Sequence, residues 1–214
     1  MNNSAANTGR VLWAGLRALL VLTVITGVLY PLAVTGIAQV AFPGKANGSE
    51  IEVDGKVVGS ELIGQTYLDG DAPDLRWFQP RPSNGLGTNS VNTQYKLILS
   101  GATNRSGDNE DLIKWVTDAK AAVVKDNSVA GYTVEPSDVP ADAVTSSGSG
   151  LDPHISPAYA KLQVHRVAEK NKLTVAQVDK LVADHTDDRI LGFIGEPRVN
   201  VLELNIALKE LTKG

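Results

Sequence analysis

The sequence predicts an α+β protein in which one N-terminal transmembrane helix precedes a single mixed α/β soluble domain. The first observation is an apolar run: residues 18–44 contain no Asp, Glu, Lys, Arg or His, and roughly 20 apolar residues suffice to cross a bilayer core. The second is the pattern beyond it, where strand and turn signals come early and capped helices dominate toward the end. The third is the absence of cysteine, which leaves packing rather than disulfides to stabilise the domain.

The charges around the apolar run predict its orientation. Arg10 and Arg17 precede it, and no acidic residue occurs before Glu50. Because positively charged flanks stay in the cytoplasm, we expect a single-pass protein of the cell (inner) membrane, with its N-terminus inside and its domain outside. The expected divisions are a cytoplasmic tail over residues 1–10, disordered as far as Gly9, a transmembrane helix over residues 11–42 and an exported (periplasmic or extracellular) domain over residues 43–214.

A cleaved signal peptide is the alternative to a retained anchor. The apolar run is much longer than the roughly 7 to 15 residues of a signal-peptide core. Gly36 and Ala38 make only a passable cleavage site. The lack of cysteine excludes a lipid-modified lipoprotein, so the retained anchor is the favoured interpretation.

The apolar helix carries a row of small or polar side chains: Thr23, Gly27, Pro31, Thr35 and Gln39 follow one another at steps of four. In lipid, such residues let helices approach closely and form interhelical hydrogen bonds. Pro31 removes a backbone donor, so we expect a kink there unless neighbouring groups repair the ladder. The row predicts a protein partner in the membrane. The alternative is ordinary membrane-helix composition, because a four-residue row drifts around a helix over this length.

Composition limits the partners of the exported part. Residues 43–214 hold all 24 acidic side chains and carry a net formal charge of about −6. This balance disfavours nucleic acid or an anionic lipid surface as a partner. A domain of this length is large enough for one hydrophobic core.

The exported part opens with a predicted β-hairpin. Residues 51–53 and 56–58 flank Asp54 and Gly55, a dipeptide that suits the positive backbone angles of a type I′ turn. The hairpin is short and needs another element to pack against.

A proline-rich segment, WFQPRP over residues 77–82, is predicted to be extended, since each proline biases the residue before it away from helix. Trp77 and Phe78 are either core residues or part of a recognition surface. Arg81 is either a structural hydrogen-bond donor or a contact in that surface. The glycine, serine and asparagine residues over 83–92 predict a loop.

The rest of the chain is predicted to be mainly helical, with a surface connection over residues 134–143 and a buried strand over residues 190–194 (ILGFI). The predicted helices are 109–125 capped by Asp108, 157–171 capped by Ser156, 174–185 with a capping box of Thr174 and Gln177, and a last helix begun by Asn200 and ending near Lys213.

No catalytic centre is identifiable in the residues. Ser149 lacks the glycines two positions before and after it that a nucleophile elbow requires. His154, His165 and His185 have no helical metal-ligand spacing. No Walker-type loop or dinucleotide-binding glycine pattern occurs. We therefore expect no catalytic residue, no bound metal and no tightly bound cofactor, as in an accessory subunit of a membrane complex.

The sequence closely resembles the C subunit of the Kdp-type potassium-transporting ATPase. The resemblance extends over nearly the whole chain in the family's order. The strings that carry it are YPLAVTGIAQ (30–39), LIGQ (62–65), RPS (81–83), GSGLDPHISP (148–157) and GEPRVNVL (195–202).

This resemblance implies a complex in which a channel-like subunit binds potassium, a P-type ATPase subunit hydrolyses ATP, and this single-span subunit is needed for assembly and activity. It also implies a catalytic-chaperone role that raises the affinity of the ATPase subunit for ATP. That role is attributed to a stretch similar to the ABC-transporter signature, and its nearest match here is Leu99, Ser100 and Gly101, without the second glycine. Potassium is then the transported ion, and ATP is reached through the ATPase subunit.

The orientation of the chain in the membrane distinguishes the hypotheses about its role. With the N-terminus inside, the domain faces away from cytoplasmic ATP, so any effect on ATP affinity is a coupling across the membrane. A direct ATP-binding chaperone requires the inverted topology, and a tethered exported hydrolase is a remote alternative. The expected subunit-contact residues are Arg81, Pro82, Asp152, His154, Glu196 and Arg198.

Overall fold

The computed structural model describes residues 3–83, 100–101 and 104–213, and mixes helices with short strands as the α+β prediction requires. The chain divides into two compact units, Met1–Ser49 and Glu50–Gly214. The first consists of helices only, and the second holds every strand of the described residues.

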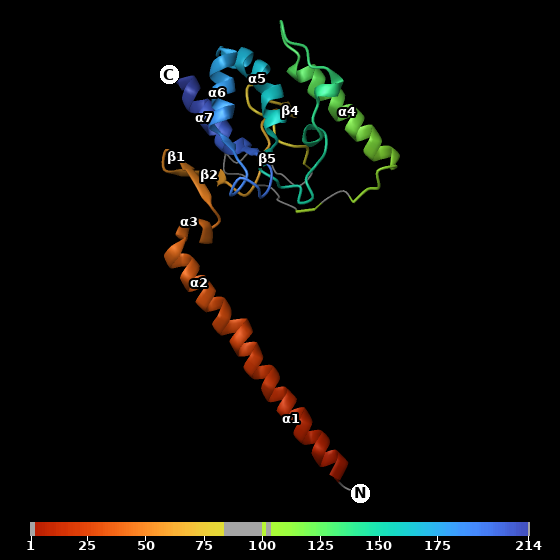
Figure 1. Ribbon diagram of the computed structural model, residues 1–214, viewed down its shortest axis with the longest axis vertical. Helices are drawn as coiled ribbons and strands as arrows, with labels where there is room; N and C mark the ends of the chain where they lie inside the picture. The colour runs from red at the N-terminus through yellow and green to blue at the C-terminus, as the bar shows by residue number, and fades with distance from the viewer. Residues whose placement is uncertain (1–2, 84–99, 102–103, 214) are drawn as a thin grey trace. The chain divides into compact units, whose positions relative to one another are not determined.

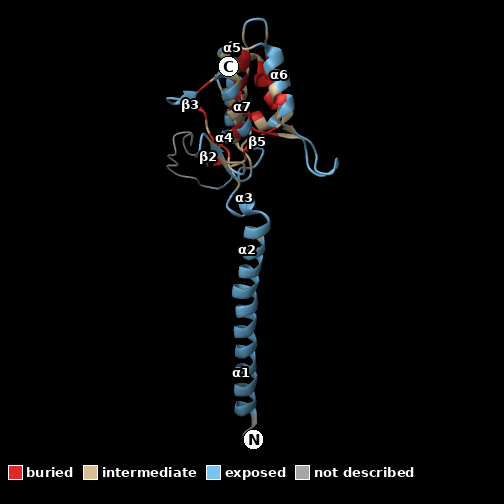
Figure 2. Ribbon diagram, turned by 90° about the vertical axis from the view of Figure 1, so that its left-hand side faces the viewer, coloured by how far each residue is buried: buried red, intermediate tan, exposed pale blue. Residues whose placement is uncertain are grey.

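The first unit is one long helix followed by a short one (Figure 1). Helix α1 (Asn3–Val24), the π-helical turn η1 (Ile25–Leu29) and helix α2 (Tyr30–Ala41) are continuous, and α3 (Pro43–Ala46) follows. Residues 4–41 are long and apolar enough to cross a membrane, and Figure 2 shows nearly all of this helix exposed. The prediction of one spanning helix is thus confirmed in length and composition.

The prediction of a disordered N-terminal tail is wrong, because α1 already begins at Asn3. Extending an existing helix by one residue costs far less than nucleating a new one. Small residues such as Ala5 and Ala6 therefore continue the helix outward, and the Thr8 hydroxyl donates to the Ser4 carbonyl at 2.8 Å.

The π turn lies directly before Pro31 and replaces the expected kink. The Tyr30 amide donates to the Ile25 carbonyl, five residues back. A proline ring crowds the carbonyl four residues before it and offers no donor of its own. The wider π turn lets the chain pass Pro31 without leaving the helical conformation.

The second unit begins with the predicted hairpin, β1 (Glu50–Val53) and β2 (Lys56–Ser60). Asp54 and Gly55 have φ values of 53° and 72°, which confirms the type I′ turn. The two-residue strands β3 (Leu68–Asp69) and β4 (Ala72–Pro73) form a second antiparallel pair.

Helix α4 (Glu110–Asn127) forms where predicted, but its cap differs from the prediction. The side chain of Asn109 accepts from the Leu112 amide at 3.0 Å. Asp108 instead accepts a hydrogen bond from the Ser106 hydroxyl. Two 3₁₀ turns, η3 (Pro136–Asp138) and η4 (Ala141–Ala143), make up the predicted connection.

The C-terminal part contains a three-stranded antiparallel sheet in the order β5-β7-β6 and three helices. Ser156 caps α5 and the Thr174–Gln177 capping box begins α6, so both predicted starts are confirmed. The bounds are β5 (His154–Ile155), α5 (Pro157–Asn171), α6 (Val175–Asp184), β6 (Thr186–Asp187), β7 (Arg198–Asn200) and α7 (Val201–Lys213).

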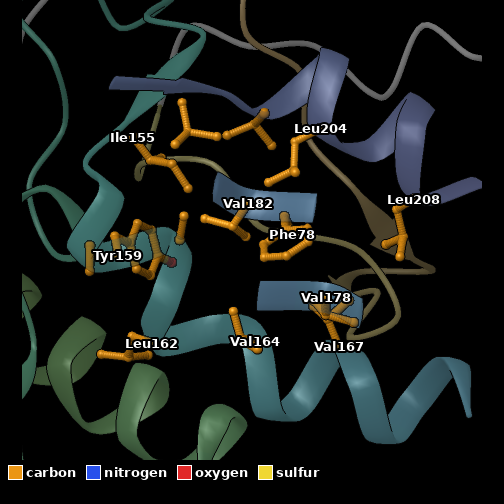
Figure 3. Close-up of a cluster of buried hydrophobic side chains, with 14 of the residues drawn as sticks. Phe78, Ile155, Tyr159, Leu162, Val164, Val167, Val178, Val182, Leu204 and Leu208 are labelled. Atoms are coloured by element: carbon orange, nitrogen blue, oxygen red, sulfur yellow. The ribbon is translucent and has the colours of Figure 1, made fainter. Parts of the chain in front are cut away.

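The core lies among α5, α6 and α7, with Phe78 fully buried between side chains of all three helices (Figure 3). Of the two interpretations of Phe78, the core one is therefore confirmed. The prediction of a buried strand over residues 190–194 is wrong. The apolar side chains there are exposed, and the segment is a tight turn between β6 and β7.

Candidate interaction sites

The segment over residues 78–82, which follows a turn at residues 75–77, is held by helix side chains instead of a sheet. The Phe78 amide donates to Asn205 Oδ1 and Asn205 Nδ2 donates to the Phe78 carbonyl, each at 2.9 Å. Gln163 forms the same pair of bonds with the backbone of Gln79, at 2.7 and 3.1 Å. Helices α5 and α7 therefore fix the backbone that carries Arg81.

Arg166 completes this framework. Its guanidinium is fully buried and donates to neutral acceptors: Asn127 Oδ1 at 2.8 Å, Gln163 Oε1 at 2.6 Å, the Trp77 carbonyl at 2.9 Å and the Leu75 carbonyl. Burial lowers the pKa of Arg166 to about 10. The sequence analysis missed this residue, because an arginine within an amphipathic helix is usually exposed.

Arg81, Asp152 and His154, all predicted as contact residues, are brought together. Arg81 Nη1 lies 3.1 Å from Asp152 Oδ2, and its other nitrogens donate to the Thr145 and Ser146 carbonyls at 3.3 Å. Asp152 Oδ1 accepts from the His154 amide at 2.9 Å. Arg81 thus serves as a structural hydrogen-bond donor.

The neighbours of Asp152 in this cluster stabilise the ionised form of its carboxylate. Hydrogen bonding from His154 lowers the pKa of Asp152 against the opposing effect of burial, and the charge of Arg81 adds to the lowering. The three side chains remain 23% to 30% exposed. One face of the cluster is therefore open to a partner, and Pro82 directly follows it in the chain.

Glu196 lies in the β6–β7 connection, and Arg198 is the first residue of β7. Arg189 Nη2 is 2.5 Å from Glu196 Oε2, and Arg198 Nη2 is 3.3 Å from Asp187 Oδ2. These pairs link the two sides of the connection.

The signature-like stretch is only partly described, because Leu99 lies outside the described residues. Ser100 and Gly101 are exposed, and the Gly101 amide donates to the Ser149 carbonyl at 2.8 Å. Within the described ranges, no group of three His, Asp or Glu residues lies close enough to hold a metal ion.

The π turn changes how the row of small or polar side chains, defined above, winds around the helix. In a uniform α-helix, four steps of four residues drift by about 160°, which would spread Thr23 and Gln39 over nearly opposite sides. A π turn holds more residues than an α-helical turn, so four residues that cross it rotate by less than 360°. This opposes the drift of the α-helical steps, and η1 therefore roughly halves the total rotation from Thr23 to Gln39. Gly27 has no heavy atom near its Cβ position except Thr23 Cγ2 at 3.9 Å. The row therefore lies closer to a single face of the helix, with open space beside Gly27.

One member of the row is engaged by its own chain. The Gln39 amide exchanges hydrogen bonds with Asn47, at 3.0 and 3.3 Å, so it ties the end of α2 to the residues after α3. We name the other members, Thr23, Gly27, Pro31 and Thr35, the predicted packing face.

Comparison with known proteins finds one family over nearly the whole chain. The family model described as "K+-transporting ATPase, c chain" matches residues 12–210. A Streptomyces avermitilis protein named potassium-transporting ATPase KdpC subunit is 76% identical over 99% of this chain and 98% of its own. Proteins of the same name from Streptomyces coelicolor and Mycobacterium tuberculosis H37Rv are 70% and 46% identical, over 99% and 94% of this chain and 97% and 99% of theirs.

Proposed function

This chain belongs to the family of the C chain of K⁺-transporting ATPases, and on that premise we propose that it is a non-catalytic accessory subunit. Its membrane helix braces the complex, and its domain, outside the cell membrane, packs on the potassium entry side. The partners are the channel-like subunit and the P-type ATPase subunit. The observation that carries the proposal is one spanning helix, which includes the predicted packing face, joined to one compact domain.

The orientation follows from charge. Arg10 and Arg17 precede the charge-free apolar run over residues 18–44, and all 24 acidic residues follow it. Because basic flanks favour the cytoplasm, the domain is placed outside. Any gain in ATP affinity of the ATPase subunit is then a coupling between two sites across the membrane.

Pocket volume does not separate the indirect role from direct ATP binding, so the topology carries that choice. A pocket of about 220 Å³ lies between the hairpin and α7, lined by Tyr67, Trp77 and Leu202 among others, and larger pockets of about 450 and 410 Å³ lie along α4. The larger two fall within the range of about 300 to 1,000 Å³ that is usual for small-molecule sites.

The hydrolase alternative has no support in the contacts of Ser149. Its hydroxyl accepts from the Leu151 amide at 3.1 Å and lies 3.3 Å from the Ser147 hydroxyl. Neither neighbour is a base that would activate a serine nucleophile. The matching test is Ser149→Ala in the purified chain, which we expect to abolish no hydrolytic activity.

Topology is the decisive experiment. Protease is added to intact spheroplasts that express the whole complex, and the chain is followed by an antibody to its C-terminus. We expect cleavage beyond Lys45 and loss of the domain, because the domain is outside. The control is the same treatment after lysis, which cleaves in either topology. Protection in intact cells would overturn the proposal in favour of the inverted arrangement.

A further inference from the structure

The turn that was expected to be a buried strand presents apolar side chains to solvent. We name residues 190–194 the apolar turn. The exposed fractions are 55% for Ile190, 79% for Leu191, 72% for Phe193 and 47% for Ile194. Four large apolar side chains exposed within five residues are characteristic of an interaction site.

The apolar turn is ordered by its own backbone. Ile190 and Ile194 exchange both backbone hydrogen bonds at 2.9 Å, and the Gly192 amide donates to the Arg189 carbonyl at 3.0 Å. Leu191 has a φ of 54°, a conformation that leucine rarely adopts. The fold therefore holds a strained leucine that contributes nothing to the core. Such strain is typical of functional positions.

The charged side chains at the base of the apolar turn form ion pairs. The ion pairs Arg189–Glu196 and Asp187–Arg198 lie on its two sides, and Asp188 is the remaining charge of the connection. An apolar centre with a paired polar rim matches the anatomy of a protein–protein interface.

We propose, resting on the function proposed above, that the apolar turn inserts into an uncharged apolar pocket of another subunit of the complex. Two observations favour a protein partner over a lipid surface. The connection and its whole domain carry more acidic than basic residues, which disfavours the anionic bilayer surface. The strained, hydrogen-bonded backbone presents one fixed shape, and a fluid bilayer requires no fixed shape whereas a pocket does.

The test uses the absence of natural cysteine in this chain. Phe193→Cys supplies a single thiol in the apolar turn, and Leu62→Cys supplies a control at a leucine that is 58% exposed. The reaction of each thiol with a polar maleimide is timed in three preparations: the full chain alone in detergent, the full chain alone in phosphatidylcholine vesicles, and the whole complex in the same detergent.

The expected result is that the thiol at position 193 reacts roughly tenfold more slowly in the complex than in the chain alone, because the centre of an interface excludes water. The thiol at position 62 should react at one rate throughout. Equal rates for position 193 in all three preparations would overturn the inference. Protection in vesicles or in the chain alone would also overturn it, since the occupant would then be lipid or a second copy.

Co-purification separates this inference from the proposed function. The unmodified chain is purified through an affinity tag on the ATPase subunit. If it is not recovered, the proposed function fails and the inference fails with it. If it is recovered while the thiol at position 193 stays reactive, only the inference fails. The double variant Leu191→Ser, Phe193→Ser should be retained less well than Leu62→Ser.

Discussion

Asn205 and Phe78 are 127 residues apart and are joined by two hydrogen bonds of 2.9 Å. The amide side chain of Asn205 pairs with both backbone groups of Phe78, as a neighbouring strand would. Buried backbone groups need such partners, and no strand runs beside this segment in the described part of the chain. A single side chain of α7 thus supplies what a sheet would otherwise provide.

Asn205→Leu should lower the free energy of unfolding of the full chain by about 2 to 4 kcal/mol, because two buried backbone groups lose their partners. The measurement is chemical denaturation in detergent, followed by circular dichroism. Lys209→Leu is the control, an exposed position one turn further along the same helix. Similar effects of the two substitutions would contradict the structural role assigned to Asn205.

The elements that could be predicted are those with local signals. Asp54-Gly55 sets its turn, and Ser156 and Thr174 set their helix starts, within two or three residues of the groups they bond. The framework around Phe78 could not be predicted in this way. Gln163 and Asn205 bond backbone groups 84 and 127 residues away, and nothing in the sequence near either residue indicates its partner.

The apolar turn was predicted wrongly for a different reason, because its local signal was present but ambiguous. Its composition suits a buried strand, and hydrophobicity alone does not distinguish a buried segment from an exposed interaction site. Gly192 and Gly195, both at a φ near 80°, turn the chain back on itself before a strand can form. Of the predicted contact residues, the clustering of Arg81 with Asp152 depends on the fold and was not predicted.

Gly59→Ala should destabilise the domain. A Cβ at this position would lie 2.1 Å from Gln65 Nε2 and 2.7 Å from Leu202 Cδ2. Both side chains are buried, so each would have to shift within the core, and the hydrogen bond from Gln65 Nε2 to the Val58 carbonyl would be disturbed. Overpacking of this kind costs about 1 to 3 kcal/mol. Gly148→Ala is the matched control, because its Cβ meets no atom within 4 Å. The measurement is thermal unfolding of both variants. Equal melting temperatures would contradict the close contact at Gly59.

Asp152 should make the stability of the chain depend on pH in acid. Its pKa is lowered in the folded protein, mainly by hydrogen bonding from His154. A lowered folded pKa contributes stability above the ordinary carboxyl value, and that stability is lost as pH falls through the folded value. Asp152→Asn should therefore be less stable than the unmodified chain at pH 7, by about 1 to 2 kcal/mol, and the difference should shrink as the pH falls below the ordinary carboxyl value.

The measurement is thermal unfolding at several pH values between 2 and 7. Asp179→Asn, at an exposed position of α6, is the control for the removal of a surface carboxylate. A difference between Asp152→Asn and the unmodified chain that stays constant down to pH 2 would mean that the charge of Asp152 contributes nothing.

Gly27→Leu should weaken co-purification of this chain with the other subunits and leave its membrane insertion intact. Leucine is at least as apolar as glycine, so insertion is not impaired, but its bulk separates helices that pack through small residues. Ala41→Leu is the control, because Ala41 lies about 120° around the helix from Thr35, the last residue of the predicted packing face. Unchanged recovery of Gly27→Leu through a tagged partner subunit would refute the predicted packing face.

Leu191 offers a test in which stability and assembly should change in opposite directions. Asparagine tolerates the left-handed conformation that Leu191 adopts, and Leu191 is too exposed to contribute to the core. Leu191→Asn should therefore leave the melting temperature unchanged or raise it, while reducing recovery with the partner subunits. Leu191→Ile keeps the apolar surface but is β-branched, so the strain increases and stability should fall by about 1 kcal/mol. If both variants lose stability and both keep full recovery, the leucine is retained for the fold and not for a partner.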